Sequence, residues 1–257
     1  MGISVAGMTT PNDSRIEPAP AIMERARRWL APVRAAAGPD FVAAYLTGSV
    51  LTQGFDPKHS HINLLVVMRS LDGPRLDTMA RSLPVQRKPP LVEPLFLTRR
   101  QIEGSLDSFP VEWLEIQERH LRLEGDDVFG GLEVPRRYLR LQCEHELRGK
   151  HIQLRQTYLL HRADGAALAR TLRASASGFA TLFRTLLRLR DEPLPAEPAR
   201  VVQRVADLYQ LDGQGLLSAH LFRYSTRRYK TDEVLTLYQR FLVEVERLIG
   251  ALDGLSL

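Results

Sequence analysis

Apolar and polar positions divide the chain into two parts with different periodicity. In the first part, Phe41–Thr47 and Ile62–Met68 are short apolar runs whose length predicts buried strands. Residues 91–98 are a third strand candidate, and Pro94 within them favours an edge strand or a bulge because proline has no N–H to donate. Residues 73–83 have helical periodicity between these strands. Strands that alternate with helices in this way predict an α/β unit.

The segment before the first strand is predicted to hold one helix. It should begin near Pro20, because proline is favoured in the first turn of a helix. Pro32 is expected to end or kink this helix, and Gly38 is expected to close the segment. Residues 1–16 are small, polar and aperiodic, so we expect them to be disordered.

From about residue 135 to the end of the chain, the periodicity is helical throughout. Within residues 138–162, steps of four and three residues place one set of side chains on a common face: Leu147, His151, Leu154, Tyr158 and His161. Four or five amphipathic helices with short connections predict a bundle. We therefore expect an α/β domain over residues 17–132 and an all-α helical bundle over residues 133–257.

Composition supports a soluble globular protein and excludes several other classes. The chain has 257 residues, of which 44% are apolar and 25% are charged, with a net charge of +5. The longest apolar run, residues 64–68, is too short to cross a bilayer, and residues 1–6 do not resemble a secretory signal. The single cysteine, Cys143, excludes an intramolecular disulfide and fits a reducing compartment, so the expected location is the cytoplasm.

The segment 45–67 carries the candidate chemistry. A strand ends at Gly48 and Ser49, a polar segment follows, and the spaced polar pair His61 and Asn63 begins the next strand. Gly48 lets the backbone approach a ligand closely, and Ser49 offers a hydroxyl and an N–H at the start of a predicted helical turn. These groups suit phosphate, so Gly48 and Ser49 are the candidate phosphate-binding residues.

This layout resembles the signature of the nucleotidyltransferase superfamily, in which a Gly-Ser turn precedes an Asp-x-Asp pair. In that superfamily, the two aspartates and a third carboxylate on a neighbouring strand hold two Mg²⁺ ions, which bind a triphosphate and activate the attacking hydroxyl. Carried onto this chain, the pair corresponds to His61 and Asn63, and the third carboxylate to Glu93. The order of elements over residues 41–131 follows the same pattern, and the helical bundle behind it is similar to that of bacterial aminoglycoside adenylyltransferases. The resemblance implies a nucleotidyltransferase-like α/β (α+β) domain with a small mixed sheet, followed by the all-α bundle.

Both aspartates of the motif are replaced here by neutral side chains. An imidazole is a poor ligand for Mg²⁺ and an amide oxygen is a weak one, so the loss of binding should slow phosphoryl transfer by many powers of ten. Neither Asp56 nor Asp126 occupies the alternating pair. We therefore assign no catalytic residue and no metal to the degenerate positions His61, Asn63 and Glu93, each of which could also be an ordinary hydrogen-bonding or solvated side chain.

These observations favour a degenerate, nucleotidyltransferase-like pseudoenzyme that acts by binding a nucleotide or a partner. One alternative is an active nucleotidyltransferase that moves a nucleotide onto a small-molecule or protein hydroxyl, in which case Mg²⁺ is the expected cofactor. A second alternative is a structural module that binds a protein partner through the helical bundle. No membrane partner is expected.

Two basic segments fall within the second half. The helix predicted from residue 166 carries four arginines within a sector of about 60° at 100° per residue: Arg170, Arg173, Arg184 and Arg188. A later loop combines basic residues with aromatic ones, namely Arg223, Tyr224, Arg227, Arg228, Tyr229 and Lys230. Both segments could bind phosphates or nucleic acid. A solvated helix face and a loop that packs its tyrosines onto the bundle are the simpler interpretations, so nucleic acid is not the favoured partner.

Arg155 and His161 match the Arg-x₅-His spacing of ribonuclease-type HEPN domains. Six residues on an ideal helix turn the side chains 240° apart, which separates this pair. We expect His161 to lie on the core face with Leu154, so RNA cleavage is not favoured.

Overall fold

The structure is a computed structural model, and it describes residues 2–3, 16–52, 55–58, 60–195, 197–225 and 227–254. The chain forms two compact units, Met1–Pro135 and Arg136–Leu257. Most of the segment expected to be disordered lies outside the described residues. Two residues of that segment, Gly2–Ile3, form strand β1, which pairs with β6 (Val134–Pro135) at the end of the first unit.

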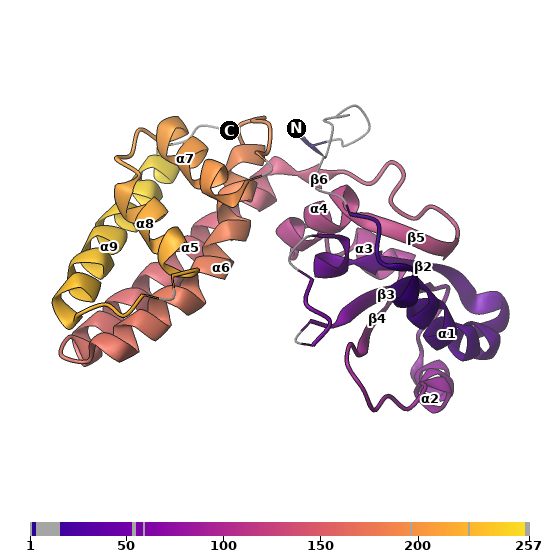
Figure 1. Cartoon of the computed structure of the whole chain (residues 1–257). Helices are drawn as coiled ribbons and strands as arrows, with labels where there is room; N and C mark the ends of the chain where they lie inside the picture. The colour runs from indigo at the N-terminus through magenta and orange to yellow at the C-terminus, as the bar shows by residue number, and fades with distance from the viewer. Residues whose placement is uncertain are drawn as a thin grey trace. The chain divides into compact units, whose positions relative to one another are not determined.

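The first unit is built on a four-stranded mixed sheet (Figure 1). Its strands are β2 (Phe41–Thr47), β3 (Ile62–Met68), β4 (Val92–Thr98) and β5 (His120–Gly125), in the order β4-β3-β2-β5. β2 is antiparallel to both β3 and β5, whereas β3 and β4 are parallel. The predicted strands are confirmed, and β4, which contains Pro94, lies at the edge of the sheet as expected.

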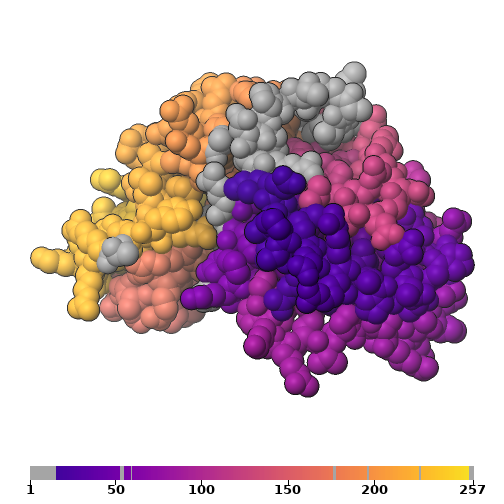
Figure 2. All heavy atoms as spheres, turned by 45° about the vertical axis from the view of Figure 1, so that its right-hand side comes forward, coloured from indigo at the N-terminus to yellow at the C-terminus, as the bar shows by residue number. Residues whose placement is uncertain are grey.

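Two helices, α1 (Pro20–Ala37) and α2 (Gly73–Ser82), cover one face of the sheet (Figure 1). Figure 2 shows α1, in indigo, at the surface of this unit. Alternate residues of β3 face this layer and are buried in its core: Ile62, Leu64, Val66 and Met68. Of the two outcomes expected at Pro32, an end of the first helix is ruled out. Pro32 lies inside α1, which continues to Gly38, because burial of Val33 and Ala37 in the core favours the last turn.

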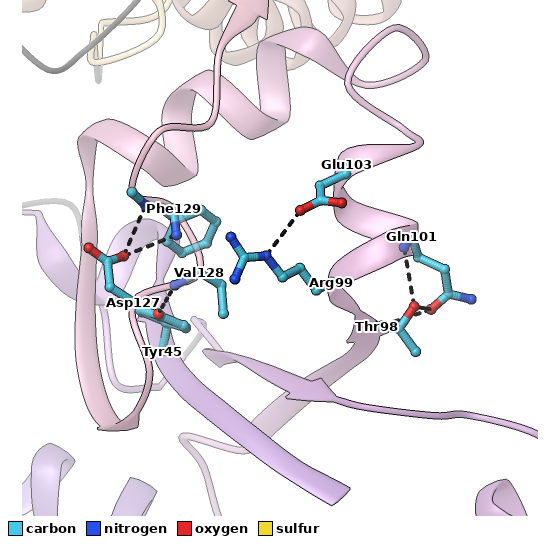
Figure 3. Close-up of polar contacts among 9 residues, drawn as sticks. Tyr45, Thr98, Arg99, Gln101, Glu103, Asp127, Val128 and Phe129 are labelled. Carbon is cyan, nitrogen blue, oxygen red and sulfur yellow. Dashed lines mark hydrogen bonds and ion pairs between the residues drawn. The ribbon is translucent and has the colours of Figure 1, made fainter.

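The opposite face is covered by α3 (Arg99–Glu103) and α4 (Pro110–Glu118) (Figure 1). Tyr45 lies on this face, fully buried, and its hydroxyl accepts a hydrogen bond from Val128 N at 2.9 Å (Figure 3). The same hydroxyl donates a hydrogen bond to the Asp126 carbonyl. The loop after β5 is thereby attached to the centre of the sheet. The Thr98 side chain caps α3 by accepting from Gln101 N.

The second unit consists of helices in all of its described regular elements. These are α5 (Arg136–His161), α6 (Gly165–Arg188), α7 (Pro198–Leu208), α8 (Gln214–Phe222) and α9 (Thr231–Asp253). The long helices α5, α6 and α9 pack against one another, and α7 and α8 pack at the side of α6. Phe179 and Phe241 join α6 to α9 in the core, with ring centroids 5.0 Å apart.

A small mixed sheet with covering helices, followed by an all-α unit, confirms the predicted fold class. The prediction for His161 was wrong, because this residue ends α5 and is exposed, as is Arg155. The other four residues of the predicted face are buried or half-buried. None of the helices that the structure describes has the length and apolar character that a membrane span requires.

Candidate functional site

The turn that follows β2 is a 3-10 helix, Gly48–Leu51. Gly48 has φ of +75°, in the left-handed region that glycine adopts most readily. The turn is held from within, because Thr52 donates to the Ser49 carbonyl from its backbone N–H and from its hydroxyl, each at 2.9 Å. Val50 and Leu51 are buried in the core below. The C-terminal end of the inner strand β2 therefore presents Gly48 and Ser49 on an anchored turn. We call this end of the sheet, where β3 begins beside the turn, the Gly48–Asn63 edge.

Asn63 lies directly beside this turn. It is paired with Thr47 in the β2–β3 register, one residue before Gly48. A Cβ atom built on Gly48 would come within 2.8 Å of Asn63 Nδ2. The absence of a side chain at Gly48 thus makes room for the Asn63 amide, and the two positions of the motif are in contact.

His61 and Asn63 point to the same face of the sheet. They alternate with Ile62, which is fully buried against the α1 layer, and successive strand residues face opposite sides. Glu93 is the register partner of Asn63 on the parallel strand β4, so its side chain lies on that face too. His61 Nδ1 lies 2.9 Å from Glu93 Oε2. The structure therefore places His61, Asn63 and Glu93, the three residues predicted to share one site, on the same face of the sheet.

The His61–Glu93 pair is open to solvent, with side-chain exposures of 50% and 66%. An exposed polar pair of this kind contributes about 0–1 kcal/mol, so this contact orients the imidazole more than it stabilises the fold. With Nδ1 directed at the carboxylate, Nε2 of His61 is the ring nitrogen left to face a ligand.

The donor set at this edge does not fit Mg²⁺. Its members are an imidazole, an amide and one carboxylate that already contacts the imidazole, whereas Mg²⁺ prefers anionic oxygen in octahedral geometry. Within the described ranges, no three His, Cys, Asp or Glu side chains form a group that could hold a metal ion. Asp126 cannot compensate, because its N–H bonds to the Val42 carbonyl, five residues or roughly 17 Å along β2 from Thr47.

His120 is a residue at the same edge that we did not predict. It is paired with Thr47 from the other side, in β5. Its Nδ1 lies 2.9 Å from the Ile116 carbonyl, and its ring packs on Tyr45 and Phe129 with centroids 5.3 Å and 4.7 Å apart. These contacts give His120 a structural role in packing. The sequence signal that could have placed it here is its position at the start of a strand.

The four arginines of α6 do not form one continuous surface. Arg170 is exposed, but the Arg173 guanidinium stacks 4.5 Å from the centre of the Phe222 ring. Arg188 is only 6% exposed, so its inclusion in a basic surface was wrong. Residue 188 sits near the end of α6, where the helix turns its side chain into the bundle beside Cys143. Burial raises the pKa of the Cys143 thiol, which makes this residue an unreactive core side chain.

Comparisons with known proteins show similarity in structure but none in sequence. No protein-family model matches the chain, and no curated protein matches its sequence. Among solved structures, the chain is similar to spectinomycin adenyltransferase AAD(9) from Enterococcus faecialis, crystallised with ATP and spectinomycin. The two are 12% identical, the match covers 89% of this chain and 98% of the other, and the TM-score is 0.48. Similarity at this level transfers neither a residue role nor an activity.

Proposed function

We propose that the chain is a degenerate nucleotidyltransferase-like protein that binds a nucleotide at the Gly48–Asn63 edge without metal-dependent catalysis. One observation carries this proposal: His61 and Glu93 are paired at 2.9 Å beside Asn63, where the superfamily resemblance requires three carboxylates. The three positions share one face of the sheet, but their side chains are not those that a two-metal site uses. A site with this geometry but without metal ligands is better suited to binding a nucleotide than to metal-dependent transfer.

Nucleotide binding is supported by the turn at Gly48. The three atoms nearest to a Cβ built on Gly48 all belong to the Asn63 side chain, and Ser49 adds a hydroxyl at the start of the 3-10 turn. Backbone N–H groups at such a turn, together with a neutral amide donor, suit phosphate oxygens. Three carboxylates without metal would repel a triphosphate, whereas this edge carries one carboxylate partnered by an imidazole.

Metal-dependent transfer is disfavoured by the same residues. Two Mg²⁺ ions would have one anionic protein ligand in place of three. The transition state of a two-metal transfer would thereby lose stabilisation on the order of several kcal/mol. Each 1.4 kcal/mol removed from transition-state stabilisation slows a reaction by about tenfold. A loss of this size leaves no effective two-metal reaction at this edge.

A second candidate function is supported by the orientation of His61. Because Glu93 holds Nδ1, Nε2 of His61 could accept the proton of an acceptor hydroxyl. The hydroxyl oxygen would then form a bond to the α-phosphorus of a nucleoside triphosphate, and the bond from that phosphorus to the leaving pyrophosphate would break. This candidate predicts metal-independent transfer that is lost in His61→Gln.

Isothermal titration calorimetry with ATP, GTP, CTP and UTP, each in Mg²⁺ and in EDTA, tests the proposal. We expect at least one nucleotide to bind with similar affinity in both conditions. Binding that requires Mg²⁺ contradicts the proposal, and release of pyrophosphate in EDTA supports the second candidate. A chain that binds no nucleotide in either condition is best described as a structural interaction module.

A further inference from the structure

The two basic segments of the second half meet on the surface of the helical unit. They are more than 30 residues apart in the sequence, but α6 packs against α8, which leads into the basic loop (Figure 1). Arg173 of α6 stacks on Phe222, the last residue of α8, at 4.5 Å. The pKa of His220 is lowered, first by burial of its ring and then by the positive charges of Arg223 in the loop and Arg184 of α6. Both arginines therefore lie close to this histidine. Positive charge from two elements is therefore concentrated around the end of α8.

The loop after α8 extends this charge. Residues 223–233 contain four basic side chains, Arg223, Arg227, Arg228 and Lys230, against two acidic ones. One of the acidic residues, Glu233, is committed locally, since it accepts from Lys230 N at 2.8 Å and pairs with Arg227 at 2.5 Å. We call the surface formed by Arg173, Arg184 and the basic residues of this loop the α6–α8 basic surface.

Aromatic rings alternate with the guanidinium groups along the loop. Tyr224 is 61% exposed. Its ring lies against His220, with ring centroids 5.5 Å apart, and the Arg223 guanidinium lies 5.5 Å from the centre of the Tyr224 ring. Tyr229 behaves as the simpler interpretation expected, because it packs on Phe222 at 4.7 Å and bonds to Ser225. Tyr224 does not, because its ring is largely exposed beside the Arg223 guanidinium.

A cavity of about 510 Å³ opens beside the same loop. Its lining combines Phe222 and Tyr229 with the polar side chains of Ser218, Thr236 and Arg240 and with the Glu233 carboxylate, which is paired with Arg227. Aromatic side chains beside hydroxyl, guanidinium and carboxylate groups are suited to a planar base with hydrogen-bond donors and acceptors on its edge.

We propose that the α6–α8 basic surface binds single-stranded nucleic acid. Arg223 and Arg228 contact backbone phosphates, an unpaired base stacks on Tyr224, and the cavity accommodates a neighbouring base. Stacking on an exposed ring requires bases that are free of a duplex, and alternating rings and cations match the alternation of bases and phosphates along a single strand. This site is separate from the Gly48–Asn63 edge and does not depend on nucleotide binding there.

Fluorescence anisotropy with labelled 12-mers of uridylate and thymidylate tests this proposal on the full chain at several salt concentrations. We expect Tyr224→Ala to weaken binding by about tenfold without changing the salt dependence, because stacking on one ring contributes about 1–3 kcal/mol. The double variant Arg223→Gln with Arg228→Gln should weaken binding and reduce the slope of log K against log salt by about 1.4, because each phosphate contact contributes about 0.7.

A matched double variant on the first unit, Arg27→Gln with Arg28→Gln, removes the same charge from an exposed face of α1 and should leave binding unchanged. An abasic 12-mer should bind wild type and Tyr224→Ala equally. The proposal is overturned if the wild type binds no 12-mer at low salt, if a 12-bp duplex binds as tightly as the single strand, or if Tyr224→Ala binds as well as wild type.

Discussion

Asn63 occupies the space that a side chain at residue 48 would need, with its Nδ2 atom 2.8 Å from where a Cβ on Gly48 would lie. Gly48 begins the turn after β2 and Asn63 lies in the adjacent strand β3, so the two residues belong to the two halves of the candidate motif. Their contact joins the turn proposed to bind phosphate to β3, the strand that carries the degenerate pair. A larger side chain at residue 48 would therefore displace the Asn63 amide.

Gly48→Ala should destabilise the first unit by about 2–3 kcal/mol. The left-handed backbone costs a non-glycine residue about 1–2 kcal/mol, and the contact with Asn63 adds to this. Gly131→Ala is the matched control, because Gly131 has φ of +76° but no atom within 4 Å of its added Cβ. It should show the backbone effect alone.

Urea unfolding followed by tryptophan fluorescence measures this difference in the full chain. Both tryptophans, Trp29 and Trp113, lie in the first unit and are buried, so the signal reports on that unit. Adding Asn63→Ala to Gly48→Ala should recover part of the loss. Equal effects of Gly48→Ala and Gly131→Ala would show that the Asn63 contact is unimportant.

His61→Asp combined with Asn63→Asp should create Mg²⁺ affinity at the sheet edge. The two aspartates would face the same side as Glu93 and supply the three carboxylates that the ion prefers. We expect the melting temperature of the first unit to fall in EDTA, from mutual repulsion of the carboxylates, and to rise with millimolar Mg²⁺. Wild type should show no such rise.

The control adds the same charges elsewhere. His145→Asp with Gln153→Asp makes the same kinds of substitution at two exposed positions of α5. It should not respond to Mg²⁺. If the sheet-edge variant responds no more than this control, then the correspondence of His61 and Asn63 with the metal-binding pair is incorrect.

Local sequence was sufficient to predict that His61 and Asn63 share a face, because alternation along a strand is a local property. It did not decide whether Glu93 joins them, since this depends on the register between β3 and β4, which is set by contacts outside either strand. The orientation of the Glu93 carboxylate toward His61 is likewise a tertiary feature.

Helix faces were less predictable than strand faces. The 100° rule placed Arg188 with the exposed arginines and His161 with the core, and both were wrong. Each residue lies at or near the end of its helix, where the bundle decides which side is covered. The meeting of Arg173 with Phe222 also depends on the packing of α6 against α8, which no periodicity within either helix contains.

Tyr45→Phe should destabilise the first unit by about 1–3 kcal/mol. The substitution leaves Val128 N without its acceptor in a buried position and releases the loop after β5 (Figure 3). Tyr138→Phe is a control of identical chemistry in the second unit, because the Tyr138 hydroxyl accepts from the exposed Arg137. Tryptophan-detected unfolding measures the loss in Tyr45→Phe, and hydrogen exchange at the Val128 amide should separate the two variants; unchanged protection at Val128 would contradict this role of Tyr45.

The helical unit should lose stability as the pH falls from 7.5 to 5.5, partly through His220. Burial of the ring, followed by the charges of Arg223 and Arg184, lowers the pKa of His220 below its ordinary value of 6.5. The unfolded chain therefore binds a proton at a pH where the folded chain does not. The stability associated with neutral His220 is fully present above pH 6.5 and is lost as the pH falls through the lower, folded value.

Thermal unfolding followed by far-UV circular dichroism at half-unit steps between pH 5.5 and 7.5 measures this dependence. His220→Asn should flatten the decline relative to wild type, whatever its effect on the midpoint at pH 7.5. His145→Asn replaces an exposed histidine of the same unit and should retain the wild-type slope. His151, whose pKa is also lowered mainly by burial, would remain in both variants, so some decline should persist. A slope in His220→Asn as steep as that of His145→Asn would exclude His220 as a source of the acid sensitivity.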